Sequence, residues 1–314
     1  MSTTLWPRLP RVGAILVGVT APGLCAQLPA DYDRDRDGWH AADPAIVAWA
    51  TLATRYNPGP EVNPEFRDAT QALGPAESPG GSVFNIISLG RGGSIELGFD
   101  APIRNGEGPD FLVFENSIID GFLELAWVEV SSNGQFFVRL PHASRIPGPV
   151  GAFANIMDNR EFDGLAGAFP LGYGTPFDLE SVRGVPGLDV ERVIAVRVVD
   201  IVGDGSATDP AGNIIYDPFP TVGSAGFDLD AVGVIHQGEP LPPVEVTIHP
   251  AAAPGNWELR WTGEASAAYV IWQTQDFANW QTIGIPLGVD GENVFIIPPE
   301  HDEVPAFYVI EPRP

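Results

Sequence analysis

Residues 92–116 contain the pattern that most constrains the fold. Apolar side chains at positions 95, 97 and 99 alternate with small or charged ones, which is the period of two of a strand with one buried face. Asn105 and Gly106 favour a tight turn. The unbroken apolar run 111–114 is typical of a strand covered on both faces or at the centre of a sandwich. We therefore predict a hairpin of two central strands.

The rest of the chain favours an all-β fold. Its 314 residues include 36 Gly and 32 Pro, and short apolar segments alternate with turn residues, as in a sandwich of short strands. Further strands are predicted at 83–89, 194–201 and 227–235, and a second hairpin at 124–131 with 136–140. One short helix is predicted at 44–54, because Asp43 and Pro44 form a helix-start pattern.

Shifts in composition divide the chain into five segments. A Pro-rich stretch, 239–243, separates a large β region from a smaller one. The predicted segments are a signal peptide at 1–26, an acidic segment at 27–44, a jelly-roll-like β-sandwich at 45–238, a linker at 239–243 and a small immunoglobulin- or fibronectin-like β-sandwich at 244–314.

The first residues predict export. Arg8 and Arg11 precede a short apolar run, 12–19, too short to span a bilayer, and cleavage after Ala26 fits the pattern of a signal peptide. No other stretch is long and apolar enough for a membrane span. Cys25 leaves a lipoprotein alternative open, although Leu24 is bulky where a small residue is preferred. Cleavage after Ala26 would remove the single Cys and with it any disulfide.

Charge excludes several functions. The formal net charge is −25, and every basic residue is Arg. The absence of Lys excludes Schiff-base and P-loop lysine chemistry. An acidic surface repels phosphate backbones, so nucleic acid is not an expected partner, whereas divalent cations are attracted. Solubility outside the cell is the alternative explanation of the charge.

Several acidic positions suggest calcium, the one cofactor that we predict. Asp33, Asp35, Asp37 and Gly38 match positions 1, 3, 5 and 6 of a calcium loop, but Pro44 stands where the closing Glu belongs. Backbone hydrogen bonding in turns and at strand ends is the alternative. The other candidate ligands flank predicted strands: Asp110, Glu115, Asn116, Asp200, Asp204, Asp217, Asp228 and Asp230.

Two long loops are candidate binding elements. Residues 141–188 and 203–226 show no long strand pattern, and loops of this length usually have a function or their own packing. If they lie at one end of the sandwich, aromatic faces from both could hold a sugar or another planar ligand. Packing within the loops is the alternative. The candidate ligand-binding residues are Tyr173, Phe177, Tyr216 and Phe219.

No catalytic residue is predicted. Glu124 and Glu129 have a five-residue offset, so they face opposite sides of a regular strand and make no catalytic pair. The five His residues lack metal-binding spacing, and no G-x-S-x-G pattern is present.

A series of short motifs resembles a family of secreted bacterial cell-surface proteins of the PEP-CTERM-associated type. The motifs include 105–111, 114–116, 164–167 and 226–233, and the resemblance covers about residues 45–237. It implies a jelly-roll sandwich, and some similar proteins are associated with corrinoid uptake. The segments 259–261 and 276–280 resemble the small β-domain of verrucomicrobial exported proteins.

These patterns predict an exported, non-catalytic binding protein, stabilised by calcium, that holds an extracellular glycan or another small ligand. A structural or adhesive surface protein is the main alternative. A corrinoid-binding surface protein and a glycoside-acting enzyme are further alternatives.

Overall fold

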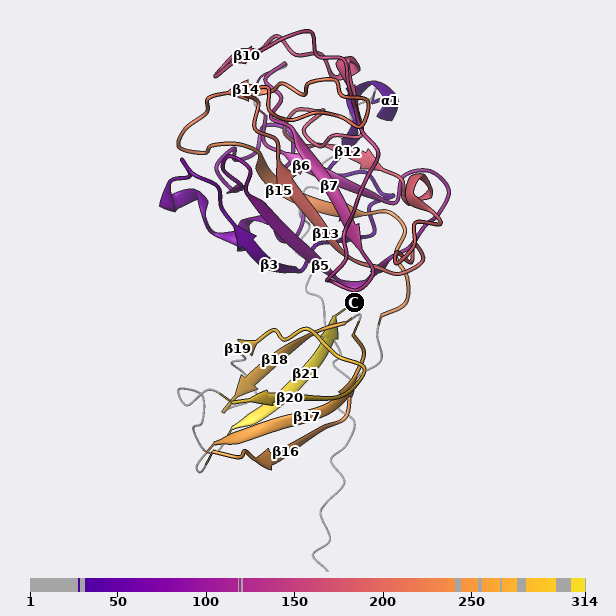
Figure 1. Ribbon diagram of the computed structural model, residues 1–314, viewed down its shortest axis with the longest axis vertical. Helices are drawn as coiled ribbons and strands as arrows, with labels where there is room; N and C mark the ends of the chain where they lie inside the picture. Colours follow the sequence, from indigo (N-terminus) through magenta and orange to yellow (C-terminus); the bar gives the residue numbers. More distant parts are fainter. Residues whose placement is uncertain are drawn as a thin grey trace, which may run out of the picture.

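The computed structural model describes residue 28, residues 32–240 except 118 and 120, and residues 244–313 except 254, 255, 266, 276–280 and 298–305. The predicted signal peptide lies outside these residues. The described chain is almost entirely β-structure, which confirms the predicted all-β class. The strands form a large sandwich and a smaller β unit nearer the C-terminus (Figure 1). Among the described residues, no helix is long and apolar enough to cross a membrane.

The first large sheet has β6 and β15 at its centre. In this sheet β6 pairs with β12 on one edge and with β15 on the other, in antiparallel register. Its strands, in spatial order, are β1 (Trp39–His40), β12 (Tyr173–Phe177), β6 (Phe111–Glu115), β15 (Asp228–Val234) and β2 (Ala48–Trp49), with β4 (Ile87–Ser88) also on β15.

The second large sheet has β13 at its centre, between β5 and β7. Its strands, in spatial order, are β3 (Leu52–Asn57), β5 (Ser94–Ile103), β13 (Val193–Asp200), β7 (Ala126–Ser131) and β8 (Val138–Arg139). The β7–β8 pair confirms the second predicted hairpin.

The main core lies between these two sheets. Alternate residues of β5, such as Leu97 and Phe99, pack with Phe111 and Val113 of β6. The other face of β6 is also covered, because Leu112 and Phe114 pack with Trp39 and neighbouring residues of the N-terminal segment. This double burial explains the unbroken apolar run of β6 and confirms that it is covered on both faces.

The predicted central hairpin is wrong. β5 and β6 are consecutive strands, but they belong to opposite sheets of the sandwich. The connection is anchored by buried Asp110, which accepts a hydrogen bond from the Gly106 amide at 2.7 Å. Because β12 and β15 occupy both edges of β6, the backbone of β6 is satisfied without β5.

The predicted helix at 44–54 is also wrong, because this segment contains β2 and the beginning of β3. The amides of Val47 and Ala50 donate to the carbonyls of Val234 and Val232, both at 2.8–2.9 Å, and Thr51 donates to Gly98. The segment thus bridges the two sheets. These long-range backbone bonds outweigh the local helix-start pattern.

The two long loops lie together at one end of the large sandwich. β10 (Val150–Gly151) of the first loop pairs with β14 (Pro218–Phe219) of the second, and both lie at the end remote from the C-terminal strands (Figure 1). In the first loop, β9 (Ala143–Ser144) pairs with β11 (Phe162–Asp163). The short helices of the described chain are α1 (Arg34–Asp37), η1 (Pro64–Phe66), η2 (Ala69–Ala72), η3 (Asn159–Glu161) and η4 (Leu179–Val182).

The smaller unit consists of two three-stranded sheets around a core that includes Trp261 and Tyr269. The first sheet pairs β16 (Val246–Pro250) and β20 (Gly291–Ile296) with β17 (Trp257–Gly263). The second pairs β19 (Gln281–Gly284) and β21 (Phe307–Arg313) with β18 (Ala268–Thr274). Among the described strands, those of the large sandwich (β1–β15) pair only with one another, and those of the smaller unit (β16–β21) do the same.

Gly167 fixes the approach of the first long loop to the segment before β7. Its φ is +88°, and a Cβ placed on it would lie 1.8 Å from the Glu124 carbonyl oxygen. Gly74 has a similar φ of +86°, but nothing lies within 4 Å of its Cβ position. Replacing each glycine by Ala therefore separates two costs in stability. Both positions have the cost of a left-handed backbone, and only position 167 has the additional cost of the close approach.

We expect Gly167→Ala to lower the free energy of unfolding by about 2–5 kcal/mol, the sum of a left-handed backbone and overpacking. Gly74→Ala is the matched control and should cost only roughly 1–2 kcal/mol. Urea unfolding measures both. Equal losses in the two variants would contradict the close approach of Gly167 to Glu124.

Candidate functional site

A hollow with a volume of about 280 Å³ opens where the two long loops meet the ends of the central strands. We call it the carboxyl pocket. Asn116 follows β6, Glu124 precedes β7, and Asp228 begins β15. Its lining residues are Phe66, Val83, Phe84, Asn116, Ser117, Ile119, Phe122, Glu124, Phe153, Thr221, Val222, Ser224 and Asp228.

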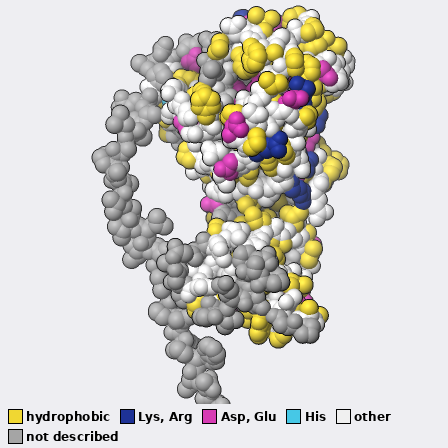
Figure 2. Space-filling view, turned by 90° about the vertical axis from the view of Figure 1, so that its left-hand side faces the viewer, with side chains coloured by type: hydrophobic (Ala, Val, Ile, Leu, Met, Phe, Trp, Pro, Cys, Tyr) yellow, Lys and Arg dark blue, Asp and Glu magenta, His cyan; other side chains and the backbone are white. Residues whose placement is uncertain are grey.

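Exposed apolar side chains surround this pocket. Phe84 and Phe153 are 72% and 75% exposed, and Ile119 and Val222 are also exposed. Phe153 stacks on Phe122, with ring centroids 6.5 Å apart. Apolar side chains are frequent at this end of the large sandwich (Figure 2). A contiguous exposed apolar rim of this kind marks a binding surface more often than a solvated one.

The polar part of the pocket is buried. Glu124 is only 2% exposed, and its Oε1 atom has no hydrogen-bond partner among the described residues. Asp228 is 3% exposed and accepts a hydrogen bond from Ser88 Oγ at 2.5 Å. The Asn116 side chain donates to the Val83 carbonyl at 2.7 Å. The pocket thus combines an apolar rim with a buried, unsatisfied carboxyl oxygen.

Glu124 and Asp228 belong to a larger group of buried acids. Burial raises the pKa of Glu124 well above its usual value, and the charges of Asp228 and Glu115 raise it further. Burial also raises the pKa of Asp228 to about 7, although hydrogen bonds from Ser88 and Ser224 oppose the rise. Glu115 is buried as well, and no donor of the described chain pairs with its Oε1 atom. A carboxyl group in such surroundings favours its neutral form unless a cation arrives.

Three other predicted acids of this end satisfy backbone groups. Asp200 accepts from the amides of Gly92 and Phe227, and burial raises its pKa to about 6. Asp217 accepts from the Leu125 amide at 3.1 Å, and burial raises its pKa well above the usual value. Asp230 accepts from the Glu77 amide at 2.9 Å, with its pKa raised by burial to about 7.

Asp110 and Asp204 also have structural partners. Asp110 is fully buried and accepts from the Leu179 amide and from His236 Nδ1, each at 2.7 Å. Asp204 belongs to the second loop and accepts from the Ser206 amide at 2.9 Å. Asp204 closes a local turn, whereas Asp110 ties together segments that are distant in the sequence. Both accept backbone hydrogen bonds, as the alternative to metal binding predicts.

The acidic segment forms a capped helical turn. Asp33 is the N-cap of α1 and accepts from the Asp35 amide, while Asp37 accepts from the Asp33 amide at 3.1 Å. Arg34 forms an ion pair with Asp43 at 2.6 Å. Within the described residues, no group of three or more acidic, His or Cys side chains is arranged to hold a metal ion. Calcium binding by the predicted ligands stays a prediction.

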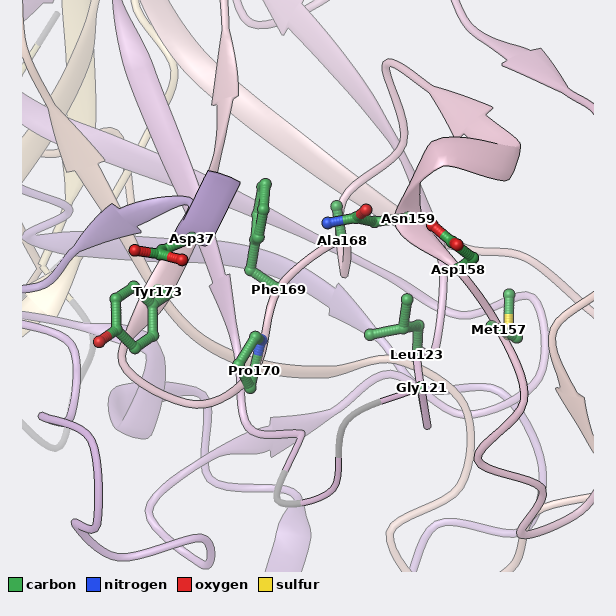
Figure 3. Close-up of a pocket in the computed structure, with 10 residues that line it drawn as sticks. All are labelled: Asp37, Gly121, Leu123, Met157, Asp158, Asn159, Ala168, Phe169, Pro170 and Tyr173. Carbon is green, nitrogen blue, oxygen red and sulfur yellow. The ribbon is translucent and has the colours of Figure 1, made fainter. Parts of the chain in front are cut away.

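A second hollow, of about 430 Å³, contains two of the predicted site residues (Figure 3). Asp37 and Tyr173 lie on one side of it, and Met157 and Asp158 lie on the other. Phe169 packs directly over Gly38, where a Cβ would lie 2.5 Å from the ring. This contact gives the glycine of the Asp-rich pattern a packing role.

Three of the predicted aromatic residues have packing partners. Phe177 is 4% exposed and stacks on Phe111 in the main core, so it presents no face to solvent. Tyr216 packs against a smaller core under the loops. Phe219 lies in β14, with the Arg91 guanidinium 5.1 Å from its ring centroid. The aromatic rings of the carboxyl pocket are phenylalanines that the sequence analysis did not select.

The main residue that the sequence analysis missed is Glu124. It lies apart from Glu129, which forms ion pairs with Arg139 and Arg197. The other acid of the pocket is Asp228, which is distant from Glu124 in the sequence and is brought to the same pocket by the fold. Of the predicted site residues, Asn116 and Asp228 line the same pocket as Glu124.

Comparisons with known proteins add no family assignment. No protein-family model matches the chain, and no curated protein matches it. The resemblance to secreted surface proteins therefore stays a prediction.

The raised pKa of Asp228 predicts an unusual pH dependence of stability. The folded state retains a proton up to about pH 7, whereas the unfolded Asp loses it near about pH 4. The free energy of unfolding should therefore fall as the pH rises between these values. Asp228→Asn should make this fall smaller.

Urea unfolding from pH 5 to 7.5 checks this expectation. Asp158→Asn is a suitable control, because hydrogen bonds from Arg160 lower the pKa of Asp158 to about 2, so this residue is ionised in both states in this range. Burial lowers the pKa of His40, so His40 makes the free energy of unfolding rise with pH, and it does so equally in every variant. An unchanged pH slope in Asp228→Asn would show that Asp228 is ionised in the folded protein at pH 5.

Proposed function

We propose that this is an exported, non-catalytic binding protein whose ligand occupies the carboxyl pocket. The observation that carries the proposal is the unpaired Oε1 atom of Glu124, buried beneath a rim of exposed phenylalanines. An unsatisfied buried carboxyl costs stability, and so does exposed aromatic surface. A ligand with polar groups at one end and an apolar face would satisfy both.

The construction of the pocket supports ligand binding over a purely adhesive or structural role. Phe153 comes from the first long loop and Val222 from the second, while Glu124 and Asp228 adjoin central strands. A rigid sandwich thus holds the polar groups, and loops provide the adaptable rim, an arrangement common in binding sites. A carbohydrate fits this description, since aromatic faces pack on sugar rings and carboxyl groups accept from hydroxyls.

Glycoside hydrolysis is a second candidate function. It is favoured by one observation, the presence of two carboxyl groups with raised pKa values, Glu124 and Asp228, in one pocket. A general acid and a second carboxylate are the usual requirements of this reaction. Release of reducing sugar from oligosaccharides, abolished in Glu124→Gln, would establish hydrolysis in place of simple binding.

Export and calcium are proposed on the sequence. The charged and apolar pattern of residues 1–26 supports a signal peptide, and the acidic composition suits a protein outside the cell. Calcium stabilisation is supported by the number and spacing of the acids, including the Asp33–Asp37 pattern.

Binding to the carboxyl pocket can be tested with a library of soluble oligosaccharides and small extracellular metabolites, using saturation-transfer NMR. We expect Phe153→Ala to weaken the strongest interaction by about tenfold, the typical value of a stacked aromatic contact.

Phe136→Ala is the control, because Phe136 is also exposed but lies outside the pocket lining. The Phe136→Ala variant should bind the same ligand as tightly as the unmodified protein does. Identical binding by both variants would place the ligand elsewhere.

The calcium prediction is tested by the melting temperature of the protein in calcium and in EDTA. Bound calcium raises the melting temperature in proportion to the logarithm of its concentration above Kd. We expect a rise in calcium that is reduced when Asp33, Asp35 and Asp37 are replaced by Asn. Equal melting temperatures in calcium and EDTA would contradict calcium stabilisation.

A further inference from the structure

The buried acids near the carboxyl pocket are not balanced by basic side chains. Among the ion pairs of the described residues, each Arg is bound to other carboxylates, and Glu115, Glu124 and Asp228 belong to none of these pairs. Arg91 acts on Asp200, whose pKa it lowers against the larger effect of burial. Glu115, Glu124 and Asp228 thus have no basic partner within ion-pair distance in the described part of the chain, and a cationic ligand would supply one.

We propose that the carboxyl pocket binds a primary ammonium group carried on an apolar body, with Glu124 as the main acceptor. This inference rests on the proposed function and names the chemical class of the ligand. An ammonium group has three donors and one positive charge, and so can satisfy the unpaired Oε1 atom of Glu124.

The rim suits the rest of such a ligand. Phe84, Phe122 and Phe153 offer apolar and aromatic surface at the mouth of the pocket. This surface can cover a hydrocarbon chain or ring, and an aromatic face also attracts a nearby cation. A ligand without an apolar body would leave this surface exposed to water.

The floor suits an ammonium group better than a divalent metal ion. Asp228 is already bound to Ser88 at 2.5 Å, and the Asn116 amide is bound to Val83. Of the described lining atoms, Glu124 Oε1 is the buried carboxyl oxygen that is left unpaired. A hard divalent ion such as calcium takes six to eight oxygen ligands, whereas one strong acceptor beside a second carboxyl matches an ammonium donor.

Benzylamine and benzyl alcohol are matched probes, since they share the ring and differ in the charged donor. We expect benzylamine to bind at least about tenfold more tightly than benzyl alcohol in titration calorimetry at pH 7.5, the effect of one charged hydrogen bond. Glu124→Gln should remove this difference and leave benzyl alcohol binding unchanged. Glu107→Gln, at an exposed position outside the pocket, is the control.

The pH dependence provides a test that needs no variant. Because a bound cation favours ionised carboxyl groups, benzylamine should bind more tightly as the pH rises from 6 to 8, with release of protons. Benzyl alcohol should show no such increase. The described titratable and charged groups that act on this region are Glu124, Asp228, Glu115, Asp217, Asp200, Asp230, Asp204, Glu77, Tyr56, Arg67 and Arg91.

Any one of the following results would overturn the inference. The two probes bind with equal affinity, or benzylamine binds equally well to Glu124→Gln, or its binding weakens as the pH rises. Displacement of benzylamine by calcium with no remaining amine effect, or failure of both probes to bind, would also overturn it. In that case binding of a neutral oligosaccharide, weakened by Phe153→Ala, would still support the proposed function.

Discussion

The burial of carboxyl groups at one end of the large sandwich is the constraint on which the candidate site depends. Glu115, Glu124 and Asp228 come together where β6, β7 and β15 begin or end. Each is almost fully buried, and a negative charge on one of them makes ionisation of its neighbour less favourable. Such a group is stable when it shares protons or when a cation enters. Entry of a cation requires an opening, and Glu124 and Asp228 line one, the carboxyl pocket.

The two long loops connect this polar floor to an apolar surface. They are held together by the β10–β14 pair and by contacts such as the Ser144 amide with Asp209 at 3.0 Å. Phe153 and Val222, one from each loop, are thereby placed on the same rim. The sandwich fixes the position of the acids, and the loops form part of the rim above them. The long loops supply Phe153, Thr221, Val222 and Ser224, and the connection between β6 and β7 supplies Asn116, Ser117, Ile119, Phe122 and Glu124.

Local sequence patterns predicted most of the central strands and one pair of neighbouring strands, β7 with β8, but not the pairing of strands distant in the sequence. The alternation in β5 and the continuous apolar run in β6 identified both strands, yet they lie in opposite sheets. Strand pairing depends on contacts between distant residues, such as Val113 with Val232, which periodicity does not contain. The segment 44–54 shows the same limit, because its backbone is satisfied by two different sheets.

The candidate site was predictable only in part, because it too depends on contacts between distant residues. Asn116 and Asp228 were predicted as polar site residues at strand ends, and both line the pocket. The long loops were predicted as binding elements, and Phe153, Thr221, Val222 and Ser224 from them line the same pocket. Glu124 was not selected, because its significance arises from burial beside Asp228, which is more than 100 positions away in the chain. Phe177 was selected for its type but packs in the core. The residue type shows which functional group is present, whereas burial determines whether that group is accessible and whether it is ionised.

The most direct test of this account is a side-chain carboxyl titration by NMR, with carbon-13 label in Glu and Asp and with Glu124→Gln and Asp228→Asn used for assignment. The account predicts that the Glu124 carboxyl titrates well above its usual range and that the Asp228 carboxyl titrates with a pKa of about 7. Titration of both groups near about pH 4, as in a solvated carboxyl, would contradict the buried, unpaired site on which the proposed ligand binding depends.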